Sequence, residues 1–275
     1  MPLPLPAGPA EANLVIYASP DVKEHAGPLL LLICGSAPGG AAGIWGRSVC
    51  INAGLEEGAM FDYIFRAQKL GWAVVVANPN VNSVSGISIP ESESPHRHLQ
   101  TLWRTYIQPS SASRVLVVAH SYGAPTMVHL LKTEPSALER VQAIAFTDGM
   151  AFPPGSLLAE VVPSEEDVAQ GLPYCSEELR TTLRRFSELA PSAFEPASPE
   201  VASHLGAIGR NFVASELPAG TPIAADDQGV VAVSAGHKSH PSTTHSATEP
   251  VFQFLQKGPE GQAGPANEEV RASLI

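Results

Sequence analysis

Basic residues are scarce in this sequence. The 275 residues include 16 lysines and arginines against 27 aspartates and glutamates, which gives a formal net charge of −11. An acidic surface repels phosphate backbones, so direct binding of nucleic acid is disfavoured. Arg180, Arg184 and Arg185 are spaced as one solvated helix face rather than as a basic patch. Any role near nucleic acid would therefore act through a protein partner.

Cysteine and long apolar runs are also scarce. Cys34, Cys50 and Cys175 lack the spacing of metal ligands, and so small and odd a number is typical of a reducing compartment. The histidines lack ligand spacing too, and no dinucleotide-binding fingerprint is present, so neither a metal nor an organic cofactor is expected. The longest apolar stretch, 29–34, is too short to span a membrane, and the Pro-rich N-terminus does not resemble a signal peptide. These absences predict an intracellular protein, nuclear or cytoplasmic, that is neither secreted nor embedded in a membrane.

The sequence does have enough apolar material for a sizeable core, because 44% of its residues are hydrophobic. Patterns typical of buried strands alternate along the chain with patterns typical of helices. The strand patterns cover 28–34, 73–77, 114–119, 141–146 and 229–234, and the helical patterns cover 60–70, 95–107, 123–133 and 249–256. This alternation predicts an α/β fold with a mostly parallel central sheet and helices on both faces.

The organisation along the chain predicts one domain. Residues 1–12 are rich in proline and alanine and are expected to form a flexible arm, and the domain itself covers 13–257. Between about 153 and 225, short helical patterns separated by prolines interrupt the alternation, which indicates a helical cap inserted over the sheet. The polar stretch 258–275 is expected to be a disordered tail.

The segment 117–123, Val-Val-Ala-His-Ser-Tyr-Gly, has the pattern of a nucleophile elbow. Such an elbow needs a buried strand, one residue in a strained turn and then a helix, with small residues two positions to either side. Gly123 supplies one small residue, and Ala119 stands where glycine is usual. Ser121 is then the candidate nucleophile, and the alternative is a serine that only caps a helix. His120 is expected to pack beside the site rather than act as the base.

Two backbone amides could stabilise an oxyanion beside Ser121. One is the amide of Tyr122, which lies at the start of the predicted helix. The fold takes the second from the loop after an earlier strand, where Gly35 is followed by Ser36 and Ala37, so either of their amides is a candidate. The alternative is that Gly35 forms a plain turn.

A serine nucleophile also needs a base and an acid that orients the base. Asp148 ends the next strand pattern at the same edge of the sheet and is the candidate acid, although an Asp-Gly pair could equally cap a turn. Three histidines follow the last strand pattern: His237, His240 and His245. Spacing alone does not choose among these three as the base.

Several motifs in the same order resemble the Argonaute-binding Arb-type domain family, which includes cotranscriptional regulators. They are Ile-Cys-Gly-Ser at 33–36, Trp-Gly-Arg at 45–47, Ile-Asn at 51–52, Asn-Pro-Asn at 78–80, the elbow at 118–123, Phe-Thr-Asp at 146–148, Asn-Phe-Val at 211–213 and Ser-Ala-Gly at 234–236. The resemblance covers about residues 28–257 and implies an α/β-hydrolase fold. It assigns the nucleophile to Ser121, the acid to Asp148 and the base to His240, with His237 as the alternative. Pro241 departs from the family pattern.

Two functions follow from these observations. The site residues favour a serine hydrolase that acts on a small carboxylic ester, thioester or amide. The resemblance instead implies a non-catalytic module that binds an Argonaute, a splicing factor or another nuclear protein in RNA silencing or cotranscriptional regulation. The two are not exclusive, because a fold alone does not determine a function.

Overall fold

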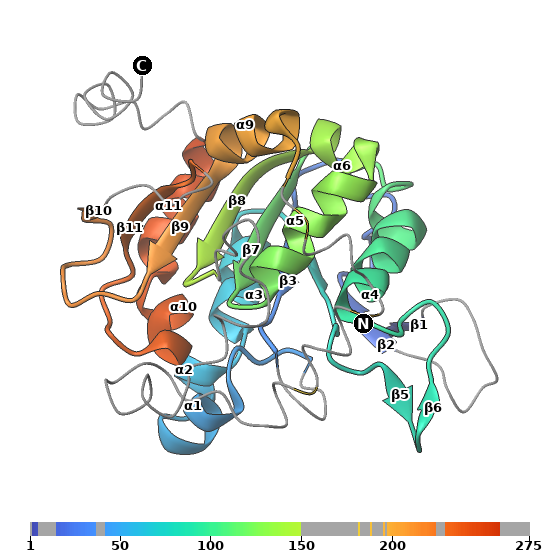
Figure 1. Cartoon of the computed structure of the whole chain (residues 1–275), viewed down its shortest axis with the longest axis horizontal. Coiled ribbons are helices and arrows are strands. Elements are labelled where there is room, and N and C mark those ends of the chain that lie inside the picture. Colours follow the sequence, from blue (N-terminus) through green and yellow to red (C-terminus); the bar gives the residue numbers. More distant parts are fainter. Residues whose placement is uncertain are drawn as a thin grey trace.

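The computed structural model of the chain describes residues 2–4, 15–36, 42–149, 181, 188, 195, 197–223 and 229–258. Within these ranges nine strands form one sheet, in the order β1-β2-β4-β3-β7-β8-β9-β11-β10 (Figure 1). The strands of the sheet are β1 (Pro2–Pro4), β2 (Val15–Ala18), β3 (Leu29–Ile33), β4 (Ala73–Val76), β7 (Val115–His120), β8 (Val141–Thr147), β9 (Gly209–Val213), β10 (Pro222–Ile223) and β11 (Val231–Ser234); β5 (Ser83–Val84) and β6 (Ile87–Ser88) form a separate hairpin.

The six central strands of this sheet, β4, β3, β7, β8, β9 and β11, run parallel to one another. The outer strands β1, β2 and β10 pair antiparallel to their neighbours. Because the central strands are parallel, the residues that follow them meet at one edge of the sheet, which is where open α/β sheets bind ligands. The predicted fold class, a mostly parallel sheet with helices on both faces, is confirmed.

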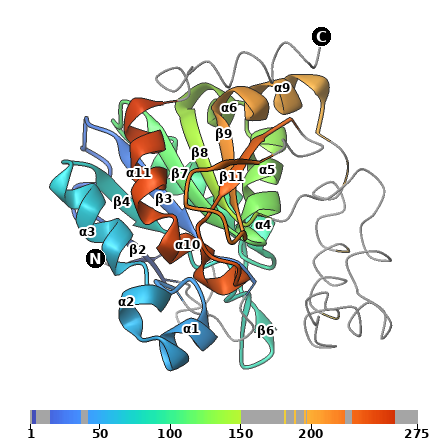
Figure 2. The ribbon, with the colours of Figure 1, turned by 90° about the vertical axis from the view of Figure 1, so that its left-hand side faces the viewer.

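Helices cover both faces of the sheet (Figures 1 and 2). In β3, Leu29, Leu31 and Ile33 enter one core and Leu30 and Leu32 enter the other, as the two-residue period of a strand requires. The first core is covered by α4 (Pro95–Leu102), the π-helix η2 (Trp103–Ile107), α5 (Gly123–Thr133), α6 (Pro135–Arg140) and α9 (Pro199–Ile208), and the second by α3 (Phe61–Lys69) and α11 (Thr248–Lys257).

Four short helices complete the described structure: α1 (Arg47–Asn52), α2 (Leu55–Gly58), the 3-10 turn η4 (His240–Ser242) and α10 (Thr243–Ser246). Both α1 and α2 contact η4, although they are almost two hundred positions away in the sequence. Together these segments bring the region after β3 next to the region after β11.

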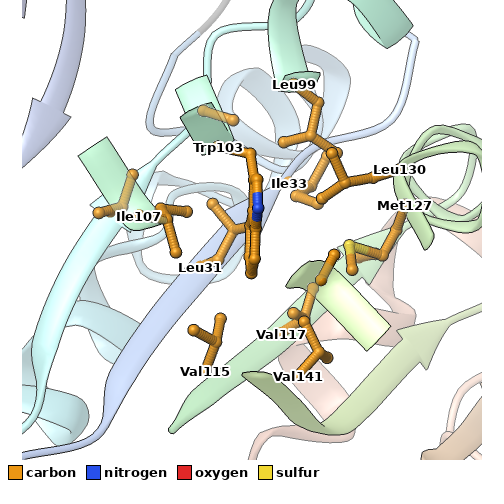
Figure 3. Close-up of a cluster of buried hydrophobic side chains, with 14 of the residues drawn as sticks. Leu31, Ile33, Leu99, Trp103, Ile107, Val115, Val117, Met127, Leu130 and Val141 are labelled. Carbon is orange, nitrogen blue, oxygen red and sulfur yellow. The ribbon is translucent and has the colours of Figure 1, made fainter. Parts of the chain in front are cut away.

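Trp103 fills the centre of the first core (Figure 3). It is fully buried and lies among the side chains of Leu31, Leu99 and Ile107. Its indole N–H donates a 2.9 Å hydrogen bond to Ser136 Oγ, so the polar end of the ring is satisfied at the boundary with α6. The preceding helix α4, which leads directly into η2, is capped by Ser94, whose hydroxyl accepts a bond from the amide of Arg97.

Two boundaries predicted from the sequence need correction. Within the arm expected at 1–12, residues 2–4 form an edge strand that pairs with β2, so this part is not free of the sheet. The cap expected at 153–225 was predicted too long. Its part from 199 to 213 belongs to the central fold, because α9 covers the first core and β9 pairs with both β8 and β11. One of the short helical patterns in that range, 200–213, is in the structure a helix followed directly by a strand. Most of the remaining cap range, like the tail 259–275, lies outside the described residues.

Across the described ranges, no helix is both long and apolar enough to cross a lipid bilayer.

Leu31 tests the packing of the first core. The side chain is fully buried against Trp103, so Leu31→Ala is expected to lower the free energy of unfolding by about 2–5 kcal/mol through lost burial and a residual cavity. Urea unfolding measures the loss. Ile51→Ala is the matched control, because that side chain is 77% exposed and its truncation should change stability by less than about 0.5 kcal/mol. Equal losses in the two variants would contradict this packing.

Candidate active site

Ser121 lies in a strained turn between β7 and α5. Its φ angle is +51°, a left-handed conformation that costs a non-glycine residue about 1–3 kcal/mol. Its amide donates to the Thr147 carbonyl on the neighbouring strand β8, and its carbonyl accepts from the amide of Ala124 at the start of the helix. The strand, turn and helix predicted around this serine are therefore present, with the turn held on both sides.

The turn requires glycine on two neighbouring segments. A Cβ atom added to Gly35 would lie 2.8 Å from Ser121 Cβ, and one added to Gly123 would lie 2.9 Å from the Ile33 carbonyl oxygen. Real Cβ atoms do not approach so closely, so the end of β3, the serine and the start of α5 can pack together only with glycines at both places. Ala119, at the other small position, is fully buried in the sheet.

Asp148 directly follows β8 at the same edge of the sheet. It too has a left-handed φ, +48°, and its amide donates to the Phe212 carbonyl. Its carboxylate oxygens have separate partners: Oδ1 accepts a 3.0 Å bond from the Ala214 amide, and Oδ2 lies 2.7 Å from His240 Nδ1. Burial raises the pKa of Asp148, but these bonds and the nearby imidazoles outweigh it and hold the pKa below its usual value. The carboxylate is therefore ionised at neutral pH.

His240 opens the 3-10 turn η4, and its imidazole is partly exposed. Because Nδ1 donates to the carboxylate of Asp148, Nε2 is left as the ring's acceptor, which is the tautomer that a general base requires. Pro241, which departs from the family pattern, stands at the start of this turn, where its fixed φ is compatible with helical geometry.

The three candidate histidines lie in different surroundings. His240 lines a cavity with Ser121. His237 is exposed, accepts a bond from the amide of Ser239 and is absent from that lining. His245 lies in α10, where its carbonyl accepts from Thr248. The geometry therefore brings together Ser121, Asp148 and His240, and leaves His237 and His245 apart.

The cavity has a volume of about 470 Å³, within the range of small-molecule sites. Its lining consists of Gly35, Ser36, Trp45, Gly46, Arg47, Ser48, His120, Ser121, His240 and Pro241. In the described part of the chain, Ser121 Oγ makes no hydrogen bond to His240, and catalytic hydrogen bonds are often long when no substrate is bound.

The two amides proposed for an oxyanion come from two different segments, the loop after β3 and the start of α5. Ser36 follows the end of β3 and lines the cavity. Tyr122 is buried and occupies the N-terminal cap position of α5. Ala37, the other candidate in the first loop, lies outside the described residues. Both amides remain candidates for this role.

His120 is buried directly beneath His240, and the two rings stack with centroids 4.9 Å apart. Its Nδ1 lies 2.9 Å from the Thr147 carbonyl oxygen, which can only accept, so Nδ1 carries the hydrogen. Thr244 Oγ1 lies within 3.1 Å of the same nitrogen. Burial, followed by the charge of His240, lowers the pKa of His120 to about 4, so this ring is neutral at physiological pH.

Three residues support the site although the sequence patterns assigned none of them a role there; two of them, Asn80 and Thr147, stand in motifs of the family resemblance. Asn80 donates from Nδ2 to the Gly35 carbonyl, 2.8 Å away, and so holds the loop that contacts Ser121. Thr147 and Thr244 lie 2.7 Å apart through their hydroxyls and connect β8 to α10. Asn80 lies in the turn after β4, at the same edge of the sheet as Ser121, and this position was a usable signal. Thr244 had no such signal, because its contacts come from distant segments.

The arrangement contains the groups that nucleophilic acyl chemistry requires. It offers a hydroxyl at a helix N-terminus, an imidazole in the tautomer of a base and an ionised carboxylate that fixes this tautomer. Within the described ranges, no group of three or more side chains is placed to bind a metal ion.

Comparison with known proteins places the chain near one family. The Arb2 domain profile matches residues 1–86 and 81–153, which together are more than half of the 275 residues. The FAM172 family protein homolog Y75B8A.31 of Caenorhabditis elegans is 39% identical over 137 residues, covering 50% of this chain and 43% of that protein. The cotranscriptional regulator ARB2A homolog of Dictyostelium discoideum is 24% identical over 278 residues, covering 87% of this chain and 61% of that protein.

This chain spans about half the length of the curated relatives it matches, between 43% and 61% for these two. Among solved structures, the histone deacetylase Clr3 is 13% identical with a TM-score of 0.49, and covers 93% of this chain and 35% of its own. A 2-hydroxy-6-oxo-6-phenylhexa-2,4-dienoate hydrolase from Rhodococcus is 15% identical with a TM-score of 0.40, and the match covers 78% of this chain and 80% of the hydrolase. The fold assignment rests on the strand order above rather than on likenesses of this size.

His120 makes the stability of the folded protein depend on pH. Its pKa falls from 6.5 to about 4 on folding, so between these values the unfolded chain binds one more proton than the folded chain. The free energy of unfolding therefore rises with pH across this window. His120→Gln should reduce the slope by about 1.4 kcal/mol per pH unit. Urea unfolding at several pH values measures it.

The exposed Ile51 supplies the control, since Ile51→Ala removes no ionisable group and should leave the slope as in the wild type. An unaltered slope in His120→Gln would show that this ring titrates alike in the folded and unfolded chains.

Proposed function

The chain belongs to the Arb2 domain family, and we propose that it is a serine hydrolase that cleaves a small carboxylic ester, thioester or amide. The observation that carries the proposal is the 2.7 Å bond between Asp148 and His240, whose ring lines one cavity with Ser121. A partly buried carboxylate that fixes the tautomer of an imidazole, in a cavity shared with a strained serine, has a direct use in acyl transfer.

The proposed reaction has two steps. Ser121 Oγ attacks the carbonyl carbon while His240 Nε2 takes the hydroxyl proton, and the amides of Tyr122 and Ser36 bind the negative oxygen that forms. When the tetrahedral intermediate collapses, the bond to the leaving group breaks and the leaving group takes the proton from His240. A water molecule, deprotonated by His240, then attacks the acyl-serine ester and releases the carboxylic acid and the free serine. Asp148 keeps Nδ1 protonated throughout.

A fluorophosphonate probe tests the nucleophile. Such probes phosphonylate a serine that an adjacent base activates, so the pure wild-type protein should be labelled and Ser121→Ala should not. In-gel fluorescence measures the labelling. Ser48→Ala is the matched control, because that serine lines the same cavity but lies in α1 rather than in the strained turn, and it should label as the wild type does. If the wild type labels no more than Ser121→Ala, the chain is not a serine hydrolase.

The names of the relatives favour a second function. Several of them are cotranscriptional regulators, and we propose that this chain also binds a nuclear protein, with an Argonaute or a splicing factor as the partner. A net charge of −11 is compatible with a protein partner and disfavours direct contact with RNA. Binding at a surface and hydrolysis in a cavity can coexist in one molecule.

Capture from nuclear extract tests this second function. Immobilised wild-type protein should retain an Argonaute or a splicing factor, identified by mass spectrometry, after nuclease treatment has removed RNA bridges. Ser121→Ala should retain the same protein, because binding at the surface does not need the hydroxyl. Absence of both partner classes from the wild-type eluate would count against the regulatory function and leave the hydrolase proposal standing.

A further inference from the structure

The imidazole of His240 is only partly held by packing. Its side chain is 44% exposed, so burial alone does not fix the position of the ring. The ring's one hydrogen-bond partner among the described residues is Asp148, and one of its faces stacks on His120, with the centroids 4.9 Å apart. The geometry of the ring therefore depends on what holds the segments around it.

Thr244 lies in a buried hydrogen-bond network next to this ring. Its hydroxyl oxygen is 2.7 Å from Thr147 Oγ1, at the end of β8, and 3.1 Å from His120 Nδ1, at the end of β7. All three residues are buried. Thr147 immediately precedes Asp148, and the helix α10, which carries Thr244, directly follows the turn η4. One hydroxyl group thus joins the strand that leads to the acid to the segment that carries His240.

Further bonds hold the backbone around this hydroxyl. The carbonyl of Thr244 accepts a 2.8 Å bond from the hydroxyl of Tyr63, which is buried in α3. The hydroxyl of Thr243 donates a 2.8 Å bond to the carbonyl of His240 and so ties α10 to η4. A polar group that loses its partner in the interior keeps the full cost of its burial. A shift of α10 relative to β8 is therefore costly, and η4 is held with α10.

We propose that the buried hydroxyl of Thr244 is the positioning group of the base. Through its contacts with the ends of β7 and β8 it holds η4 in place, and so keeps Nδ1 of His240 directed at the carboxylate of Asp148. Without the hydroxyl, the ring withdraws from the carboxylate and its proton divides between Nδ1 and Nε2. The inference rests on the proposed hydrolase function in treating His240 as a base, and the geometry itself can be measured without a substrate.

Thr244→Val tests this role in the full chain, because valine keeps the shape of threonine and removes the hydroxyl. With 4-nitrophenyl acetate as the substrate, kcat should fall about tenfold to a hundredfold, the loss that a misplaced catalytic group causes. KM should stay as in the wild type, because Thr244 is absent from the described lining of the cavity. Thr244→Ser restores the hydroxyl and should recover most of the lost kcat.

Thr101→Val is the matched control. The side chain of Thr101 is also buried, and its hydroxyl donates a 2.7 Å bond to the carbonyl of Glu91, in the loop before α4. The substitution removes a comparable buried bond outside the network and should keep the wild-type kcat. Thr147→Val removes the other end of the 2.7 Å contact and should reproduce the fall in kcat, so it replaces Thr244→Val if that variant does not fold.

The tautomer of His240 is a readout that a general loss of stability does not move. Long-range proton–nitrogen NMR correlations distinguish the two tautomers of a neutral imidazole, and the spectrum of His240→Asn assigns the signals. At mildly alkaline pH, the wild type, Thr244→Ser and Thr101→Val should show the Nδ1–H tautomer. Thr244→Val should show a mixture of the two tautomers.

The two assays separate this proposal from the hydrolase function. If the fluorophosphonate labels Ser121 but Thr244→Val keeps the wild-type kcat and tautomer, the positioning role is wrong and the hydrolase stands. If labelling fails while Thr244→Val still mixes the tautomers of His240, the positioning role stands without the reaction. A fall in kcat with an unchanged tautomer would overturn the proposal, because the hydroxyl would then act on stability or packing alone.

Discussion

The parallel pairing of β3, β7 and β8 is the constraint on which the rest of the structure depends. Each of these strands is buried on both faces, so its side chains serve packing, and polar chemistry can begin only where the strand ends. Because the three strands run parallel, their carboxyl ends lie at the same edge of the sheet. Gly35, Ser121 and Asp148 are the residues found there, and their backbones approach so closely that a single methyl group at Gly35 would collide with the serine.

Two adjacent imidazoles near that edge differ in their hydrogen-bond partners and in their burial. His240 donates to an ionised carboxylate and remains partly exposed, whereas His120 donates to a backbone carbonyl in the interior and is kept neutral by burial. The buried ring therefore supports the outer ring without competing for its proton. This division is compatible with catalysis, and it is equally compatible with a rigid pocket that a regulator of the Arb2 family uses for recognition.

Much of this arrangement could be predicted from the sequence, because it follows from local patterns. The apolar strand pattern before Ser121 and the helical pattern after it predict the elbow, and Asp148 follows the next apolar strand pattern. Other features depend on contacts between distant segments. Spacing did not choose among His237, His240 and His245, because the bond to Asp148 spans 92 positions. Likewise β9 was hidden in a helical pattern, since a short strand after a helix is defined by its neighbours in the sheet.

The same long separation has a consequence for biosynthesis. The ribosome releases β3, β4, β7 and β8 long before η4, and domains generally fold while the chain is being made. The turn at Ser121 can therefore form on the nascent chain with β7 and β8, whereas Asp148 reaches its final geometry only with Phe212 and Ala214, and His240 arrives with the segments that close the second core. The three side chains of the candidate site therefore come together last, when η4, α10 and α11 dock on a sheet most of which has already formed.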